Sequence, residues 1–444
     1  MSPGMQDVRG ALDPPSVGTA RSLFVPFALA ALALVICVTF AHFADPIPLT
    51  DDSLTYFKIA ENVSYGKGFT DDGIRPHFYR PPLFSSMLGG WFFITGSRTL
   101  IAVRLYQSLC IAASVFFAYF LFLELMPAFR GRSAAVATAW VAVQPSLWTQ
   151  TAFTLQEPTI LLVTTIACWL TLRWFRFPGK ARAALAGASW GIATLAKAVT
   201  LFVPLLLPIF WFLVRKKDWR VPFPEIALSV FTFFLAIAPW TARNYYHLHR
   251  LVPVNDQGLG MLEWNVQHSD APVDEGKNSV ALLLTLLQTK DATRGELDGE
   301  KFLAELDREG MSGKERKNEL WAYILAHKKY FLLQRLANAL LFAAPSAEWW
   351  IATGRLTTLL PEPYANLPYR GFALFLHAPF YLFLMGRIYR FLKGTLAPSF
   401  SFLVLLYIGY WSTYALFVGA PRFAVPVYPV LVAMAPWDRI FSKT

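Results

Sequence analysis

Apolar runs long enough to cross a bilayer recur along this chain of 444 residues. A helix needs about 20 apolar residues to cross roughly 30 Å of hydrocarbon. Hydrophobic residues make up 55% of the sequence and charged residues only 16%, too few charges to cover a water-soluble domain of this size. Membrane barrels show alternating segments of about ten residues, and that pattern is not found. We therefore predict an all-α polytopic membrane protein.

We expect about ten transmembrane helices. The candidate spans are residues 24–43, 101–126, 134–148, 158–174, 183–198, 201–214, 226–241, 372–385, 400–418 and 424–436.

Basic residues gather in every second short loop between these spans. They occupy the loops at 130–132, 173–182, 215–220 and 387–393, whereas the intervening loops carry few charges. Short loops rich in Lys and Arg stay in the cytoplasm, so both termini are predicted inside and the alternate loops outside. The net charge of +11 is explained by this asymmetry and does not indicate a nucleic-acid partner. We expect a multi-pass protein of the cytoplasmic membrane.

The chain divides into a membrane body and two external regions. Residues 1–22 are rich in Pro, Gly and Ser and are predicted to form a disordered cytoplasmic tail. An N-terminal membrane module at 23–243 includes a first external loop at 44–96. A second external region covers 244–370, and 371–444 supplies the C-terminal membrane helices. Within the first loop, 53–65 has the apolar spacing of an amphipathic helix lying at the membrane surface.

Three acidic residues are predicted on the outer side. Asp51 and Asp52 directly follow the first span, and Glu157 directly precedes a later one. Carboxylates at the rim of a membrane bundle can serve as general bases toward a substrate that arrives through lipid. The alternative is helix capping, since each acid stands at a predicted helix start, where negative charge is favourable. The residues alone leave both interpretations open.

Four cations share this predicted side: Arg80, Lys197, Arg243 and Arg422. Guanidinium and ammonium groups gathered on one rim can bind a phosphate. The alternative is that each is an interfacial residue whose charged end reaches toward water. No phosphate-binding glycine loop of the nucleotide-binding kind is present, which argues against a nucleotide-sugar donor.

Several segments in a fixed order resemble one family. They are TDDSLTYFKIAENVSYGKGF, YRPPLF, LQEPTILL, GIATLAKAVTLFVPLLL, APWTARNYY, PVNDQGLGMLEWN and RFAVPVYPVL, which together cover most of 44–431. The sequence resembles the GT-C membrane glycosyltransferases, specifically the family-39-like group that includes protein O-mannosyltransferases and the lipid A aminoarabinose transferase. The resemblance implies a GT-C helical bundle with external interfacial helices.

The resemblance also implies a reaction. A sugar would pass, with inversion, from a polyprenyl-phosphate donor to a glycan, lipid or protein acceptor at the outer face of the membrane. Asp51 matches the catalytic base. Asp52 matches the second acid of the pair, which is often Glu in relatives. Glu157 matches an acid that arranges the acceptor or a divalent cation, so a divalent metal ion is an open alternative and no other cofactor is implied.

The remaining matched positions are donor and substrate contacts. Arg80 stands where relatives carry a basic residue before Pro-Pro, and Lys197, Arg243 and Arg422 resemble the cations on the phosphate side. Glu263, Trp264 and Asn265 match a loop that contacts substrate or simply packs.

Two other classes of function stay open on the sequence. A lipid-carrier transporter or flippase would place its charges near mid-bilayer within broken helices. A lipid-linked glycan ligase of the cell envelope would not need the paired acids. Charges at the rim favour the transferase.

Overall fold

The computed structural model describes residues 21–44, 49, 51–125, 130–214, 221–267, 298–343, 367–416 and 421–437. Every regular element within these ranges is helical, so the predicted all-α fold is confirmed for them. Nearly all of the predicted tail at 1–22 lies outside the described residues.

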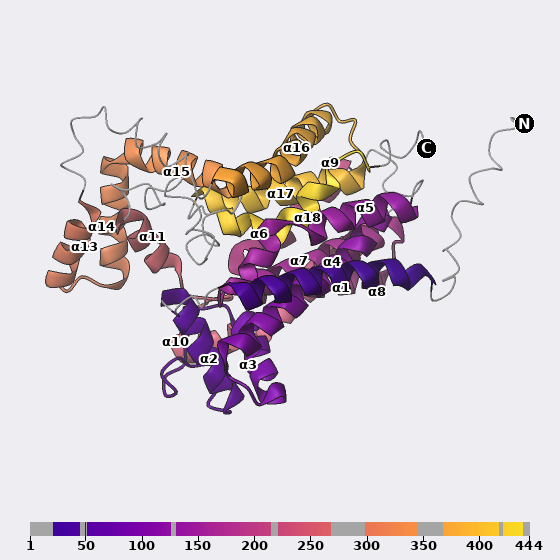
Figure 1. Ribbon diagram of the computed structural model, residues 1–444. Helices are drawn as coiled ribbons and strands as arrows, with labels where there is room; N and C mark the ends of the chain where they lie inside the picture. The colour runs from indigo at the N-terminus through magenta and orange to yellow at the C-terminus, as the bar shows by residue number, and fades with distance from the viewer. Residues whose placement is uncertain are drawn as a thin grey trace, which may run out of the picture.

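The main bundle is made of helices that run alongside one another (Figure 1). They are α1 (Arg21–Phe43), α4 (Leu100–Leu125), α5 (Arg130–Ala142), α7 (Glu157–Arg176), α8 (Lys180–Ala196), α9 (Val203–Val214), α10 (Phe223–Leu248), α16 (Leu367–Leu392), α17 (Pro398–Leu416) and α18 (Tyr428–Ala433).

Five of the described helices are long and apolar enough to cross a membrane, namely those in α1, α4, α7, α10 and α17. The chain is therefore a multi-pass membrane protein. Five of the expected spans are not among these helices: 134–148, 183–198, 201–214, 372–385 and 424–436. At 183–198 and 372–385 the observed helices, α8 and α16, are longer than the expected spans.

Two of the expected spans are interrupted at proline. The run at 134–148 ends as α5 and resumes as α6 (Pro145–Trp148), with Gln144 between them in an extended conformation. The residue before a proline is disfavoured in the helical region, which accounts for the break. The run at 424–436 forms the 3₁₀ segment η7 (Pro421–Val427) and then the short α18. Within these two expected spans the helix is therefore interrupted.

The remaining elements lie around one end of the bundle or beyond it. They are α2 (Asp51–Ser64), α3 (Pro82–Thr95), α6, η2 (Thr149–Ala152), η3 (Ala198–Phe202), α11 (Gly258–Gln267), α13 (Gly299–Arg308), α14 (Gly313–Ala326) and α15 (Lys328–Ala343). In Figure 1, α11, α13 and α14 gather at the left, beyond the ends of the membrane helices. The amphipathic helix expected at 53–65 is present as α2.

Charge pairing distinguishes the two ends of α7. At its C-terminal end, Arg173 and Arg176 donate to the carboxylate of Glu124 at the end of α4, over 3.1 and 3.3 Å. Glu157 is its first residue, and at 1.5 Å per residue it lies roughly 28 Å from Arg176. The basic end and the acidic end of this helix are therefore separated by about the thickness of a bilayer core.

The close contact between α8 and α10 depends on glycine. A Cβ added at Gly187 would lie 1.9 Å from the backbone oxygen of Ser229 in α10. Backbone atoms cannot move aside as a side-chain end can, so the two helices can approach this closely only with glycine at that position.

We expect Gly187→Ala to lower the free energy of unfolding by about 3 kcal/mol, because overpacking a tight contact forces backbone shifts. Thermal unfolding in detergent micelles would measure it. Gly386→Ala on α16 is the matched control, since nothing lies within 4 Å of its added Cβ, and it should leave stability unchanged or slightly raised. Equal melting temperatures for the two variants would contradict the close-approach argument.

Candidate active site

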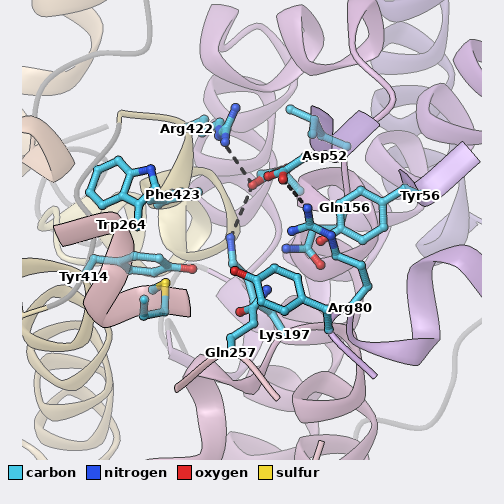
Figure 2. A pocket seen from close by; sticks show the side chains of 14 residues that line it. Asp52, Tyr56, Arg80, Gln156, Lys197, Gln257, Trp264, Tyr414, Arg422 and Phe423 are labelled. Atoms are coloured by element: carbon cyan, nitrogen blue, oxygen red, sulfur yellow. Dashed lines mark hydrogen bonds and ion pairs between the residues drawn. The ribbon is translucent and has the colours of Figure 1, made fainter. Parts of the chain in front are cut away.

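A cavity of about 280 Å³ opens where the ends of several bundle helices meet α2 and α11 (Figure 2). Its lining combines charged and aromatic side chains from distant parts of the sequence. They are Asp52, Tyr56, Tyr79, Arg80, Leu155, Gln156, Glu157, Lys197, Gln257, Met261, Trp264, Tyr414, Arg422 and Phe423.

Glu157 is the most buried charge of this cavity, with 2% of its surface exposed. Its Oε1 accepts a hydrogen bond from Lys197 Nζ at 3.4 Å and lies 4.0 Å from Nε of Arg422. Its other oxygen, Oε2, has no hydrogen-bond partner among the described residues. A buried carboxylate oxygen in that state is suited to accept a hydroxyl donor or to bind a cation.

The chain around Glu157 is held by α4. Gln107 Nε2 donates to the carbonyl of Leu155 over 2.9 Å, and the hydroxyls of Tyr106 and Thr159 lie 2.9 Å apart. Proline at the second position of α7 suits the first turn of a helix, where its missing N–H would be unpaired anyway. The helix start therefore presents Glu157 in a fixed position.

The second ion pair of the cavity joins Asp52 to Arg80. An Arg80 terminal nitrogen donates to Asp52 Oδ1, and the guanidinium lies 5.2 Å from the ring centre of Tyr56 and 5.1 Å from that of Tyr79. Asp52 is the second residue of α2. Asp51 is the first residue of α2, and its side chain lies outside the described residues.

Backbone contacts fix the segment that carries Arg80. The N–H of Asp256 donates to the carbonyl of Phe78 over 2.9 Å, and Asn255 Nδ2 donates to the carbonyl of Tyr79 over 3.2 Å. A Cβ at Gly260 would lie 2.6 Å from the Tyr79 hydroxyl, so α11 approaches this tyrosine closely. Burial raises the pKa of Tyr79, which keeps its hydroxyl protonated.

Lys197 enters the cavity because the chain is extended there. The residue directly follows α8, with φ −159° and ψ 126°. Its ammonium lies 4.1 Å from the ring centre of Phe423 and 5.2 Å from that of Tyr414, within cation–π range. Burial lowers the pKa of Lys197, and the carboxylate of Glu157 opposes that shift.

Three predicted site residues whose side chains the structure describes do not line this cavity. Arg243 lies inside α10 and donates to the carbonyl of His77 over 3.2 Å, while its guanidinium is 4.4 Å from the ring centre of Trp240. Glu263 forms an ion pair with Arg316 of α14. Asn265 is buried, and its Nδ2 donates to the carbonyl of Met261 within α11 over 2.7 Å. Contacts of these three with a substrate stay predictions.

Several lining residues were missed by the sequence analysis: Tyr56, Tyr79, Gln257, Met261, Tyr414 and Phe423. Tyr79 and Phe423 each adjoin a predicted cation, and Tyr56 lies one helical turn from Asp52, so aromatic residues near charged positions were a usable signal. Tyr414 and Met261 carried no such signal, because only the packing of α17 and α11 brings them to the site.

The cavity brings together five of the predicted charges: Asp52, Arg80, Glu157, Lys197 and Arg422. Among the side chains that the structure describes there, three cations face two carboxylates; the one excess positive charge suits an anionic ligand such as a phosphate ester. Among the described residues, no group of three or more His, Cys, Asp or Glu side chains is placed to hold a metal ion.

Residues 83–252, less than half of the chain, match the model of the dolichyl-phosphate-mannose-protein mannosyltransferase family. No curated protein matches the chain. Among solved structures, the archaeal oligosaccharyltransferase AglB from Archaeoglobus fulgidus, in complex with an inhibitory peptide and a dolichol-phosphate, aligns with a TM-score of 0.51 at 14% identity, over 92% of this chain and 50% of its own. The same enzyme complexed with zinc and sulfate aligns with a TM-score of 0.51 at 14% identity, over 94% and 49%. ArnT from Cupriavidus metallidurans bound to undecaprenyl phosphate aligns at 15% identity, over 94% and 76%, with a TM-score of 0.42.

The chain thus has the fold of the GT-C membrane glycosyltransferases, and the resemblance inferred from its sequence is confirmed. It spans about half the length of the oligosaccharyltransferase structures that it matches.

Proposed function

We propose that the protein is an inverting membrane glycosyltransferase that moves a sugar from a polyprenyl-phosphate donor to a hydroxyl acceptor at the outer face of the cytoplasmic membrane. The observation that carries the proposal is the cavity at one end of a GT-C bundle, where two carboxylates meet three cations. The match of 83–252 to a dolichyl-phosphate-dependent family and the polyprenyl phosphates bound by AglB and ArnT support this donor class.

The cations act on the leaving group in this proposal. As the bond between the anomeric carbon and the phosphate oxygen breaks, negative charge grows on the phosphate. Lys197 and Arg422 lie beside one another around Glu157, and Arg80 faces the same cavity. Positive groups fixed in advance stabilise that charge more in the transition state than in the bound substrate. Arg243 is the fourth predicted cation, and its contacts give it a supporting role in the external loop.

The carboxylates act on the acceptor. Asp51 takes the proton of the acceptor hydroxyl as its oxygen bonds to the anomeric carbon, and a single displacement inverts the configuration. Asp52 is already paired with Arg80 and orients that cation. Glu157 Oε2, buried and without a hydrogen-bond partner among the described residues, is suited to orient the acceptor or a divalent cation. Trp264 supplies an apolar face to a sugar ring.

The position of the charges argues against the transporter alternative. A carrier that alternates between two sides binds its substrate near mid-bilayer, at discontinuous helices. Glu157 instead stands at the first position of α7, and Lys197 directly follows α8, so both lie at helix ends.

The test is transfer by the purified protein in proteoliposomes. A panel of synthetic polyprenyl-phosphate pentoses and hexoses would be supplied with envelope lipids and glycans from cells that lack the gene. We expect one panel member to release free polyprenyl phosphate and to give a product of inverted anomeric configuration, detected by mass spectrometry and NMR. Movement of the intact donor across the bilayer without bond cleavage would favour the transporter and overturn the proposal.

A further inference from the structure

No described side chain of helix α15 lines the cavity, yet one of its side chains contacts two of the elements that do line it. The Arg335 guanidinium donates through Nη2 to Asn265 Oδ1 of α11 at 2.6 Å and through Nη1 to the carbonyl of Leu416, the last residue of α17. Its neighbour Gln334 accepts from the same guanidinium and donates through Nε2 to the backbone oxygen of Asn265 at 3.4 Å. Arg335 therefore joins α11 to the end of α17.

Each end of this link lies close to a cavity residue. Asn265 adjoins Trp264, and its side-chain amide donates to the carbonyl of Met261. Trp264 and Met261 both line the cavity. Leu416 lies two positions beyond Tyr414, which also lines the cavity, and Figure 2 shows Tyr414 on the same side as Trp264. A cation at the carbonyl end of a helix is favourable, so Arg335 also stabilises the last turn of α17.

A second contact ties α15 to the same side of the cavity. The ring of Phe342 stacks on Tyr414 at 5.5 Å between centroids, and Tyr414 stacks on Phe423 at 4.6 Å. Phe423 is the ring that Lys197 faces. The Trp411 indole donates to the carbonyl of Ala339 over 3.0 Å, which fixes α15 along α17. Because these contacts fix α15 against α17, the backbone that carries Arg335 is also fixed, and its side chain can position α11.

We propose that Arg335 is a positioning residue that sets the separation between Trp264 on α11 and Tyr414 on α17, and with it the alignment of the sugar or acceptor in the cavity. The inference rests on the proposed function. The ion-paired groups Glu157, Lys197 and Arg422 come from the bundle itself and do not depend on this link. Loss of Arg335 therefore disturbs alignment and spares phosphate binding.

The test compares Arg335→Met with Lys328→Met, an exposed residue whose change removes the same charge from the same helix. In Arg335→Met we expect faster amide exchange across 258–267. Sugar transfer should fall roughly 10- to 100-fold, since small misplacements of bound groups cost that much. The Kd for polyprenyl phosphate should stay within about twofold of the parent value. Hydrogen exchange with mass spectrometry, the proteoliposome assay and equilibrium binding would measure these three. Lys328→Met should match the parent in all of them.

Three outcomes would overturn the inference. They are unchanged exchange across 258–267, transfer equal to that of the parent despite faster exchange, and loss of polyprenyl-phosphate binding together with transfer, which would mark a general structural role. Arg335→Lys keeps the charge but lacks the two terminal nitrogens with which the guanidinium reaches Asn265 and Leu416 together. Full recovery of transfer in this variant would therefore also contradict the inference. If the parent protein shows no transfer, the proposed function is refuted. The exchange and binding measurements would still test whether Arg335 positions α11.

Discussion

Asp51→Asn is expected to lower the rate of sugar transfer by about 10²- to 10⁴-fold, the usual contribution of a general base. The amide is close to isosteric with the carboxylate but cannot accept the proton of the acceptor hydroxyl. Thermal stability and the Kd for polyprenyl phosphate should stay near the parent values, because the cations of the cavity are unaffected. Single-turnover transfer in proteoliposomes, with the donor bound in advance, would isolate this step.

Two further variants on α2 sharpen this prediction. Glu61→Gln removes an acid from the same helix, outside the cavity lining, and should leave transfer unchanged. Asp52→Asn breaks the ion pair with Arg80 and should cost less than Asp51→Asn, mainly through weaker donor binding. If Asp52→Asn proves the more damaging of the two in single turnover, Asp51 is not the base. If both variants transfer at the parent rate, the carboxylate pair serves as a helix cap.

Lys197→Met is expected to reduce both stability and transfer. Among the described residues, it leaves the Glu157 carboxylate, 2% exposed, with Arg422 at 4.0 Å as its one cation partner. Breaking a buried ion pair on one side costs about 3 to 5 kcal/mol, because the remaining charge stays buried. Removing a group that stabilises the leaving phosphate costs roughly 10²- to 10³-fold in turnover.

The double variant Lys197→Met with Glu157→Gln separates these two effects. Without either charge, the buried carboxylate no longer opposes folding, so thermal stability should return toward that of the parent. Transfer should stay at least 10²-fold down, because the ammonium is still missing. A double variant that regains transfer together with stability would show that Lys197 serves only to neutralise Glu157.

The main lines of the fold followed from the sequence because they depend on local chemistry. Apolar runs of bilayer length and the alternation of basic loops predicted the multi-pass helical bundle. The amphipathic spacing after the first span predicted α2. Helix ends were less well predicted, as at Gln144, because a proline or an extended residue can interrupt an apolar run without changing its composition.

The candidate site was predicted in part. Asp52, Arg80, Glu157, Lys197 and Arg422 were selected by residue type and predicted side, and the structure brings all five to one cavity. Arg243 has the same charge and the same predicted side, yet its guanidinium donates to the backbone carbonyl of His77. Position along the chain cannot separate these two outcomes, because the direction of a side chain depends on how its helix is packed.

By itself the sequence determined that this chain folds as a multi-pass helical membrane protein, and it predicted on which side of the membrane the charged candidate residues lie. Those properties depend on residues taken one at a time or a few positions apart. The tertiary structure alone decided which rim charges share a cavity, which aromatic rings complete it, and that Arg335 joins α11 to α17. Contacts between residues 70 and 81 positions apart depend on helix packing, which no local pattern encodes.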